Sequence, residues 1–290
     1  MFMYNHPVHM MLIKDLYQYG MEFLTSNSVP TPGTDAAILL NKVTGLGLID
    51  VYRDPETDIP QQMVEQYNEL LERRVHHEPV AYILGHKEFY SRTFCVNSSV
   101  LIPRPETEML VDEVKEIARN INSPVILDLG TGSGCIAITL KGELGDSSCF
   151  ASDNSVAALG VAAHNAEAIG LEVCFICGDL LQGFKSSVFD IIVSNPPYIS
   201  DEDYTKLEKN VKNFEPREAL VSKDDGLYVI RNIVFHSRYV IKHGGWLVIE
   251  VGYNQSEAVR QLFESSGYKN IDIIKDLAGI ERVIKAQWIN

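Results

Sequence analysis

Short apolar runs that alternate with helical stretches constrain the fold of this 290-residue chain more than any other feature. Each run is followed by polar or glycine-rich residues. The five runs span residues 125–129, 149–152, 173–177, 190–194 and 246–251. Continuous apolar strands separated by helices are typical of a parallel sheet covered on both faces, so we expect an α/β fold.

Two more strands are expected near the end of the chain. The runs 271–274 and 282–286 are separated by only seven residues, which is too few for the crossover that joins parallel strands. These last two strands should therefore pair antiparallel. A seven-stranded sheet of five parallel strands and a closing antiparallel pair is the layout of Rossmann-like class I methyltransferases rather than of dinucleotide dehydrogenases.

The first 85 residues have apolar side chains at helical spacing, as at Leu12, Leu16 and Phe23. We expect a small helical domain there, with Thr34 as the N-cap of one helix. This segment holds five Lys or Arg against eleven Asp or Glu. It is either a plain acidic helical bundle or a module that docks a protein partner.

A β-hairpin is expected to link this domain to the sheet. Apolar residues alternate over residues 86–103, and Asn97-Ser98-Ser99 is a turn signal. The chain thus divides into a helical docking domain (1–85), a hairpin linker (86–103) and a catalytic domain (104–290). Apolar residues in 110–117 predict a helix at the start of the last part.

Charge and targeting signals limit the partners. The net charge is -14, whereas binding to a phosphate backbone draws on clustered Lys and Arg. A local basic groove on an acidic protein remains compatible with this balance. Residues 1–11 have no positively charged start or cleavage site, and no stretch is apolar enough to span a bilayer. We therefore expect a cytoplasmic protein that binds no membrane and no nucleic acid directly.

The cysteines predict neither disulfides nor a metal. Five cysteines, an odd number, do not indicate a disulfide framework in a chain of this length. Cys174 and Cys177 have the spacing of half a zinc site, but no second such pair or matching His pair accompanies them. We expect them to be buried core cysteines, and we expect no bound metal.

A glycine-rich loop follows the first of the apolar strands. Its sequence runs Asp128-Leu129-Gly130-Thr131-Gly132-Ser133-Gly134 and opens a helix at Cys135. The glycines let the backbone turn sharply and approach a ligand. The Asp128 carboxylate would repel a pyrophosphate but suits a ligand with ammonium and sulfonium groups, which favours S-adenosylmethionine over a dinucleotide. The alternative is a Gly-rich turn with a structural role alone.

Two acidic positions at later strand ends fit the same ligand. Asp153 can accept hydrogen bonds from both ribose hydroxyls, although it could equally stabilise the start of the following helix. Gly178-Asp179-Leu180 follows the next strand, where Asp179 could accept from the adenine amine and Leu180 could offer its N–H and an apolar face. Taken alone, this second segment is compatible with an ordinary turn.

The sequence Asn195-Pro196-Pro197-Tyr198 indicates the reaction. It lies at the carboxyl end of a central strand, where open α/β sheets bind ligands. Prolines donate no N–H, so the carbonyls of Asn195 and Pro196 can point into a pocket. An NH2 group has two protons, which the Asn195 side-chain oxygen and the Pro196 carbonyl could accept, while Tyr198 offers a ring for stacking. Two acceptors would draw electron density onto an amide nitrogen and orient its lone pair towards a sulfonium methyl.

Further motifs resemble the bacterial peptide chain release factor glutamine methyltransferases over roughly residues 34 to 287. The motifs that carry the resemblance, beside those above, are Glu78-Pro79-Val80-Ala81-Tyr82-Ile83-Leu84-Gly85, Glu88-Phe89-Tyr90, Leu101-Ile102-Pro103-Arg104-Pro105-Glu106-Thr107-Glu108, Glu215-Pro216-Arg217-Glu218-Ala219-Leu220, Asp225-Gly226-Leu227 and Glu250-Val251-Gly252. The first eight residues have no counterpart in the family.

The resemblance implies N5-methylation of the glutamine in the Gly-Gly-Gln motif of release factors, with S-adenosylhomocysteine as the second product. It places the donor on the glycine loop, Asp153 and Leu180, and the glutamine amide on Asn195 to Tyr198. It also places Arg104, Glu106 and Thr107 near the active site, where Arg104 could instead be an ion-pair partner and Thr107 a helix cap. In the family the helical N-terminal domain helps to bind the protein substrate.

Two other functions remain open from the sequence. Asn-Pro-Pro-Tyr also serves adenine-N6 methyltransferases of DNA or RNA, which must extract a base and hold a backbone. The acidic N-terminal part disfavours that function. A binding module that uses the donor pocket only for stability is the third candidate. We expect a monomeric enzyme.

Overall fold

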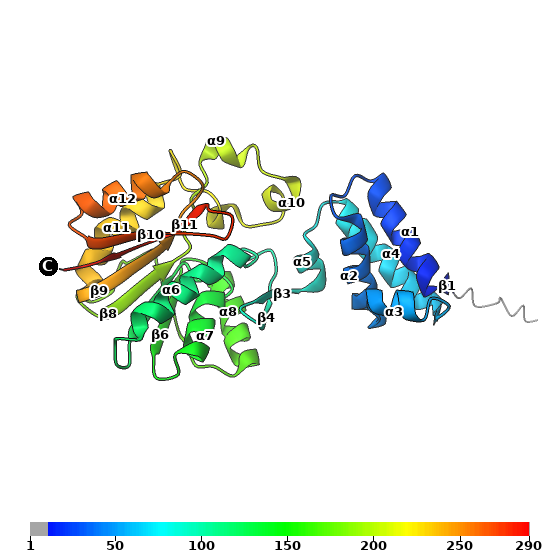
Figure 1. Ribbon diagram of the computed structural model, residues 1–290, viewed down its shortest axis with the longest axis horizontal. Helices are drawn as coiled ribbons and strands as arrows, with labels where there is room; N and C mark the ends of the chain where they lie inside the picture. The colour runs from blue at the N-terminus through cyan, green and yellow to red at the C-terminus, as the bar shows by residue number, and fades with distance from the viewer. Residues whose placement is uncertain (1–10, 290) are drawn as a thin grey trace, which may run out of the picture. The chain divides into compact units, whose positions relative to one another are not determined.

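The computed structural model describes residues 11–289, and the chain divides into two compact units between Gly85 and His86 (Figure 1). Two expectations concern the start of the chain: that residues 1–11 carry no targeting signal, and that residues 1–8 have no family counterpart. Residues 1–10 lie outside the described residues, so the structure does not test either expectation. Among residues 11–289, no helix combines the length and the apolar character that crossing a bilayer requires.

The N-terminal unit is helical, as its apolar spacing predicts. Its elements are β1 (Met11–Leu12), α1 (Ile13–Ser26), α2 (Pro32–Thr44), α3 (Leu48–Arg53), β2 (Asp58–Ile59), α4 (Gln61–Val75) and α5 (Val80–Leu84). Thr34 is not an N-cap, which corrects that expectation, because α2 begins two residues earlier at Pro32. Proline suits the first helical turn, where its missing N–H has no partner to lose.

The core of this unit is closed by one tight contact. Tyr67 is fully buried, and its hydroxyl donates to the Ala36 carbonyl oxygen at 3.1 Å. A Cβ atom on Gly20 would lie 1.9 Å from the same hydroxyl oxygen. Only glycine at this position of α1 therefore lets α4 pack so closely.

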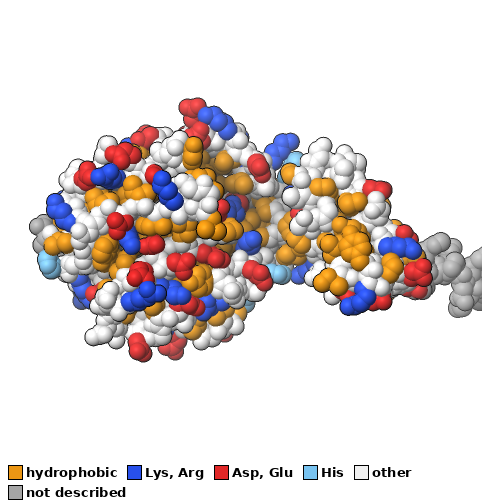
Figure 2. All heavy atoms as spheres, viewed as in Figure 1, with side chains coloured by type: hydrophobic (Ala, Val, Ile, Leu, Met, Phe, Trp, Pro, Cys, Tyr) orange, Lys and Arg blue, Asp and Glu red, His pale blue; other side chains and the backbone are white. Residues whose placement is uncertain are grey.

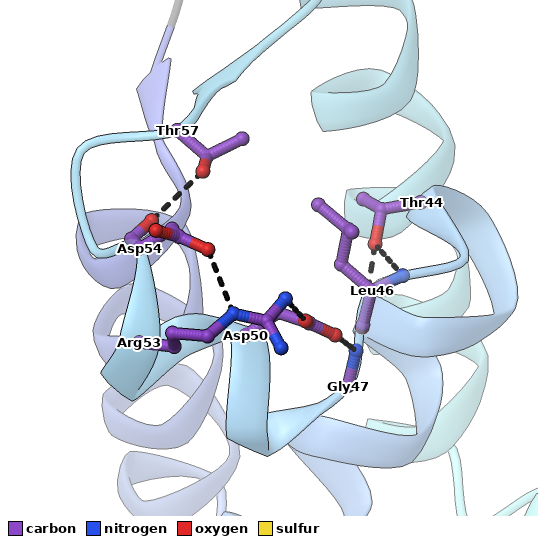
Figure 3. Close-up of polar contacts among 7 residues, drawn as sticks. All are labelled: Thr44, Leu46, Gly47, Asp50, Arg53, Asp54 and Thr57. Carbon is purple, nitrogen blue, oxygen red and sulfur yellow. Dashed lines mark hydrogen bonds and ion pairs between the residues drawn. The ribbon is translucent and has the colours of Figure 1, made fainter.

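The short helix α3 is held by polar contacts at both ends (Figure 3). Asp50 Oδ2 accepts from the Gly47 amide at 2.8 Å, and Arg53 pairs with Asp50 and Asp54. These contacts fix a helix whose apolar residues Ile49 and Tyr52 are 76% and 74% exposed. Figure 2 shows hydrophobic side chains gathered on one face of this unit among charged ones.

The second unit is built on one seven-stranded sheet. Its strands are β5 (Val125–Leu129), β6 (Ser148–Asp153), β7 (Cys174–Cys177), β8 (Phe189–Ser194), β9 (Ile241–Glu250), β10 (Lys269–Lys275) and β11 (Glu281–Gln287), in the spatial order β10-β11-β9-β8-β5-β6-β7. The neighbours from β7 to β9 pair in parallel, and β11 pairs antiparallel with both β9 and β10. The predicted sheet and its antiparallel last pair are confirmed.

Helices cover both faces of this sheet, as the apolar strands require (Figure 1). The helices are α6 (Glu108–Ala118), α7 (Cys135–Glu143), α8 (Val156–Ile169), α11 (Tyr228–Val240) and α12 (Ser256–Ser265). Buried residues of α6, α7 and α8 form one core cluster with the sheet, and those of α11 and α12 form the other. The chain also has the short helices α9 (Asp201–Tyr204) and α10 (Lys209–Lys212) and the 3₁₀ turns η1 (Pro105–Thr107) and η2 (Arg217–Ala219).

The expected hairpin is present, but its turn is not where the sequence placed it. Strands β3 (His86–Phe89) and β4 (Arg92–Cys95) pair antiparallel. They are joined at Tyr90 and Ser91, whose φ angles of 49° and 59° are those of a two-residue hairpin turn. Asn97-Ser98-Ser99 forms a separate turn after the hairpin, closed by the Asn97 side chain.

The paired cysteines are exposed, which corrects the expectation that they are buried. Cys174 and Cys177 lie on β7, the edge strand that pairs only with β6. The apolar run around them predicted a covered strand, but edge strands have fewer neighbours to bury them. Within the described range, the structure contains no group of three or more His, Cys, Asp or Glu placed to hold a metal.

Candidate active site

The glycine-rich loop turns back over the carboxyl ends of β5 and β6. Gly130, Gly132 and Gly134 have φ angles of 74°, 55° and 81°, which side chains rarely adopt. The amides of Gly130 and Thr131 both donate to the Ser152 carbonyl oxygen, at 2.8 and 2.9 Å. The loop is thus fixed to the neighbouring strand.

The glycines of this loop differ in what surrounds them. A Cβ atom on Gly130 or Gly132 would meet no heavy atom within 4 Å. A Cβ atom on Gly134 would lie 2.7 Å from Ile138 Cδ1 and 3.0 Å from Ala162 Cβ. Gly134 therefore permits close packing of α7 on α8, whereas the first two leave open space beside the backbone.

Asp128 lies beneath the loop at the end of β5 and is fully buried. Its Oδ2 accepts from the Thr131 hydroxyl at 2.6 Å and from the Ala137 amide at 3.1 Å. Its Oδ1 has no partner among the described residues. Burial raises the pKa of this carboxyl to about 7, although both hydrogen bonds oppose the rise.

Asp153 joins the loop from the end of β6. Its Oδ2 accepts from the Gly132 amide and its Oδ1 from the Ser155 amide, both at 2.9 Å. Each carboxylate oxygen keeps further lone pairs for a ligand. Asp153 therefore contacts both the glycine loop and the N-terminal end of α8, and its hydrogen bonds to ribose hydroxyls stay a prediction. The actual N-cap side-chain bond of α8 comes from Ser155.

Asp179 and Leu180 follow β7 at the same edge of the sheet. Asp179 is exposed and its Oδ2 accepts from Gln182 Nε2 at 3.0 Å. Leu180 has a φ angle of 48°, an uncommon value for a residue with a branched side chain. The Gly178 amide donates to the Asp153 carbonyl oxygen at 3.0 Å, which links this turn to the end of β6.

These features fit a cationic nucleoside ligand such as S-adenosylmethionine. The open space beside Gly130 and Gly132 leaves room for a ligand along the backbone. The unpartnered Oδ1 of buried Asp128 is an acceptor suited to a cationic group, and Asp153 offers two oxygens to vicinal hydroxyls. The Ser133 carbonyl oxygen accepts a hydrogen bond from Asn165 Nδ2 at 2.9 Å, which helps to fix the loop.

The segment Asn195 to Tyr198 leaves β8 at the centre of the sheet. The Ser194 hydroxyl, just before this segment, donates to the Leu129 carbonyl oxygen at 2.7 Å. At the other end of the segment, Gln255 Nε2 donates to the Tyr198 carbonyl oxygen at 2.9 Å. Within residues 11–289, no hydrogen bond ends on the Pro196 carbonyl oxygen or on Asn195 Oδ1. Both atoms are thus acceptors without a partner among the described residues.

A cavity of about 190 Å³ opens onto this segment. Its lining includes Leu101, Arg104, Asn195, Pro196, Tyr198 and Leu207. Arg104 Nη2 lies 2.6 Å from Glu215 Oε1, and Glu215 Oε2 accepts from the Ile102 amide at 3.2 Å. This pair ties the residues before α6 to the segment after α10, which form two walls of the cavity.

A chain of hydrogen bonds runs behind Asn195. Asn195 Nδ2 donates to Thr107 Oγ1 at 3.0 Å, and the Thr107 hydroxyl donates to Glu250 Oε2 at 2.7 Å. The Tyr198 hydroxyl donates to Glu250 Oε1 at 3.4 Å. Burial raises the pKa of Glu250 to about 7 and that of Tyr198 above its usual range.

The structure brings most residues singled out in the sequence to one edge of the sheet. Arg104, Thr107, Asn195 and Pro196 surround the cavity or its hydrogen-bond chain. Glu106 lies on the turn η1, and its negative charge contributes to the raised pKa of Glu250. Pro197 also lines the cavity.

Three further residues support this site and were not identified as site residues in the sequence. Glu215 and Glu250 are buried acids, and Gln255 holds the Tyr198 carbonyl. An acid within the apolar run 246–251 is the signal that could have identified Glu250, because a buried strand rarely carries a charge without a role.

Comparisons with known proteins identify the family to which the chain belongs. The model of the PrmC N-terminal domain matches residues 15–85, and that of the methyltransferase small domain matches residues 105–214. A release factor glutamine methyltransferase from Koribacter versatilis is 36% identical, over 94% of this chain and 98% of that protein. The chain belongs to the release factor glutamine methyltransferase family.

Another family member, from Nitratidesulfovibrio vulgaris, is 38% identical over 95% of both chains. Membership makes this chain a methyltransferase, and the family implies S-adenosylmethionine as the methyl donor. Among solved structures, the hMettl16 catalytic domain superposes with a TM-score of 0.57 at 14% identity, covering 82% of this chain and 87% of that one. That likeness shows the Rossmann-like methyltransferase fold, in agreement with the prediction from the strand pattern.

Proposed function

We propose that this enzyme transfers a methyl group from S-adenosylmethionine to the side-chain N5 of the glutamine in the Gly-Gly-Gln motif of release factors. The observation that carries the proposal is the pair of acceptors at the end of β8, Asn195 Oδ1 and the Pro196 carbonyl oxygen, which no described residue occupies. An NH2 group offers one proton to each, and a cavity of about 190 Å³ suits a single side chain.

The two acceptors activate the amide nitrogen as the nucleophile. An amide nitrogen is a weak nucleophile because its lone pair is delocalised over the carbonyl. Hydrogen bonds to Asn195 Oδ1 and to the Pro196 carbonyl draw electron density onto the nitrogen and fix the direction of its lone pair. No strong base is needed before transfer, since the surplus proton leaves the nitrogen afterwards.

The donor site is assigned to the glycine loop and the strand ends beside it. S-adenosylmethionine supplies an electrophilic methyl group on a sulfonium sulfur when it is bound. Asp128 and the backbone from Gly130 to Gly134 hold its cationic end, with Thr131 and Ser133 shaping the loop. Asp153 takes the ribose hydroxyls, and Asp179 and Leu180 border the base. Asn195 lies where the donor and the glutamine meet.

The N-terminal unit, residues 1–85, is proposed to dock the release factor, with residues 86–103 as the linker and residues 104–290 as the catalytic domain. The exposed Ile49 and Tyr52 on α3 support a docking face. Arg104, Glu106 and Thr107 complete the substrate pocket. The proposal further includes a monomeric enzyme without a metal, acting in the cytoplasm, where translation terminates.

The direct test is to incubate the full chain with methyl-labelled S-adenosylmethionine and a purified release factor, and then to map the label by peptide mass spectrometry. We expect one methyl group on the glutamine of Gly-Gly-Gln. A release factor with Gly-Gly-Ala should stay unlabelled. Label on duplex DNA or RNA instead of the release factor would establish the adenine-N6 alternative. Donor binding without labelling of any of these would contradict the proposal.

A further inference from the structure

The hydrogen-bond chain behind Asn195 has a direction. Its three members come from distant parts of the chain, since Thr107 ends η1, Asn195 follows β8 and Glu250 ends β9. Thr107 and Glu250 are both 3% exposed, so water does not compete for their hydrogen bonds. A hydroxyl group has a single proton to donate.

That single proton determines how the Asn195 amide is turned. The Thr107 hydroxyl donates to Glu250 Oε2 at 2.7 Å, and therefore has only lone pairs left for Asn195. The NH2 end of the Asn195 amide is the end that can donate to those lone pairs, as it does at 3.0 Å. The opposite end, Oδ1, is left as the free acceptor.

We propose that Thr107 and Glu250 are positioning residues that hold the Asn195 amide with its oxygen towards the substrate, so that the site takes an NH2 group and rejects a carboxylate. This inference rests on the proposed function, because it assigns the Asn195 oxygen to the substrate nitrogen. With the amide reversed, Nδ2 would face the cavity and would favour a carboxylate oxygen over an NH2 group. These hydrogen bonds thus let the site distinguish glutamine from glutamate.

The negative charge on Glu250 keeps the direction of these hydrogen bonds, because an ionised carboxylate can only accept the Thr107 proton. Thr107 and the titratable Tyr198 act on Glu250 through hydrogen bonds, Arg282 of β11 acts by attraction and Glu106 of η1 by repulsion. Burial outweighs the favourable contacts and raises its pKa to about 7. A protonated Glu250 becomes a donor itself, which frees the Thr107 proton for the oxygen of Asn195 and permits the reversed amide.

Four variants separate positioning from stability. Thr107→Val removes the hydroxyl at nearly constant volume, and Thr107→Ser retains it. Glu250→Gln removes the charge, since an amide can either donate to Thr107 or accept from it. Thr139→Val is the matched control, because Thr139 is also fully buried and its hydroxyl has no partner in the described structure.

The variants are assayed with the full-length enzyme on a release factor carrying Gly-Gly-Gln, and donor affinity is measured separately by calorimetry. We expect Thr107→Val and Glu250→Gln to lower kcat by about 10- to 100-fold, in line with the loss of residues that orient a functional group. Donor Kd should change less than threefold, Thr107→Ser should recover most of the kcat that Thr107→Val loses, and Thr139→Val should keep near wild-type kcat. The wild-type kcat should fall below about pH 7 at saturating donor, and Thr107→Val should lack that acid limb.

The relative affinity for release factors with Gly-Gly-Gln and Gly-Gly-Glu is a further measurement, and a less stable enzyme would not change this ratio. Wild-type enzyme should prefer the Gln form, and Thr107→Val should reduce that preference at least tenfold. If Thr107→Val keeps the wild-type preference and acid limb, the inference is wrong while the proposed function stands. If wild-type enzyme methylates no Gly-Gly-Gln release factor, the proposed function itself fails.

Discussion

Arg104 and Glu215 are 111 residues apart in sequence, and their guanidinium and carboxylate groups meet at 2.6 Å beside the cavity. Glu215 is buried, and it also accepts from the amide of Ile102. The Glu215 carboxylate therefore accepts the hydrogen bond of the Ile102 N–H and also anchors the Arg104 side chain, both just before the turn η1. The sequence left open whether Arg104 contacts substrate or forms an ion pair. The structure contains the ion pair, and Arg104 also lines the cavity.

Glu215→Ala should lower both stability and substrate binding. It leaves the Ile102 N–H and the Arg104 charge without their partner, and we expect the free energy of unfolding to fall by about 2 to 4 kcal/mol. KM for the release factor should rise, because the ion pair that joins two walls of the cavity is lost. Glu218→Ala, at an exposed position of η2, is the control and should change neither quantity. Urea denaturation and steady-state kinetics measure the two effects, and an unchanged KM would contradict the assignment.

Substitutions in the glycine loop should separate donor binding from folding. Gly134→Ala forces a Cβ atom against Ile138 and Ala162, so we expect a loss of about 2 to 5 kcal/mol in unfolding free energy. Gly132→Ala meets no atom, so only the positive φ costs stability, about 1 to 2 kcal/mol. Its methyl group should instead weaken donor binding more than tenfold. Thermal unfolding and calorimetry with S-adenosylhomocysteine distinguish the two, and equal donor affinities for Gly132→Ala and wild type would count against the loop as the donor site.

Asp153→Ala should weaken the donor more than Asp179→Ala does. Asp153 contacts the loop through Gly132 and offers two carboxylate oxygens, whereas Asp179 is exposed and bonded to Gln182. We expect donor Kd to rise by about 10- to 100-fold for Asp153→Ala, corresponding to about 1.4 to 2.8 kcal/mol. Asp179→Ala should change it less. Equal effects measured by calorimetry would show that the ribose contact is misassigned.

Stability should depend on pH through Asp128. Its folded-state pKa of about 7 lies above the ordinary value of 3.8, so the folded state binds the proton more tightly than the unfolded state does. The stabilisation from this proton is complete below about pH 4 and is lost as the pH rises through 7. Asp128→Asn should therefore raise Tm relative to wild type at pH 8 more than at pH 5, while donor affinity falls. A Tm difference independent of pH would contradict burial as the cause.

The strand pattern predicted the sheet well because burial acts directly on composition. The run 125–129 coincides with β5, and the spacing of 271–274 and 282–286 identified the antiparallel pair. The hairpin turn was missed because Tyr90 and Ser91 adopt positive φ without the Asn or Gly that normally marks such a turn. Tertiary packing, with Phe89 and Phe94 in the core, imposes this turn instead.

The site was predictable where a motif carries its own geometry and unpredictable where it depends on contacts across the fold. Asn195 to Tyr198 follow a strand, so local sequence indicated where their carbonyls lie. The hydrogen bond from Thr107 to Glu250, 143 residues away, arises only when η1 and β9 come together. The exposure of Cys174 and Cys177 likewise depends on the position of β7 at the edge, which no local pattern records.

The most direct test of the central claim is single-turnover methylation of a Gly-Gly-Gln release factor by Asn195→Ala at saturating donor, with donor Kd measured in parallel. The loss of one preorganised acceptor should raise the barrier to methyl transfer by about 2 to 4 kcal/mol while donor binding changes much less. Wild-type turnover by Asn195→Ala would contradict the claim that its side-chain oxygen activates the glutamine nitrogen.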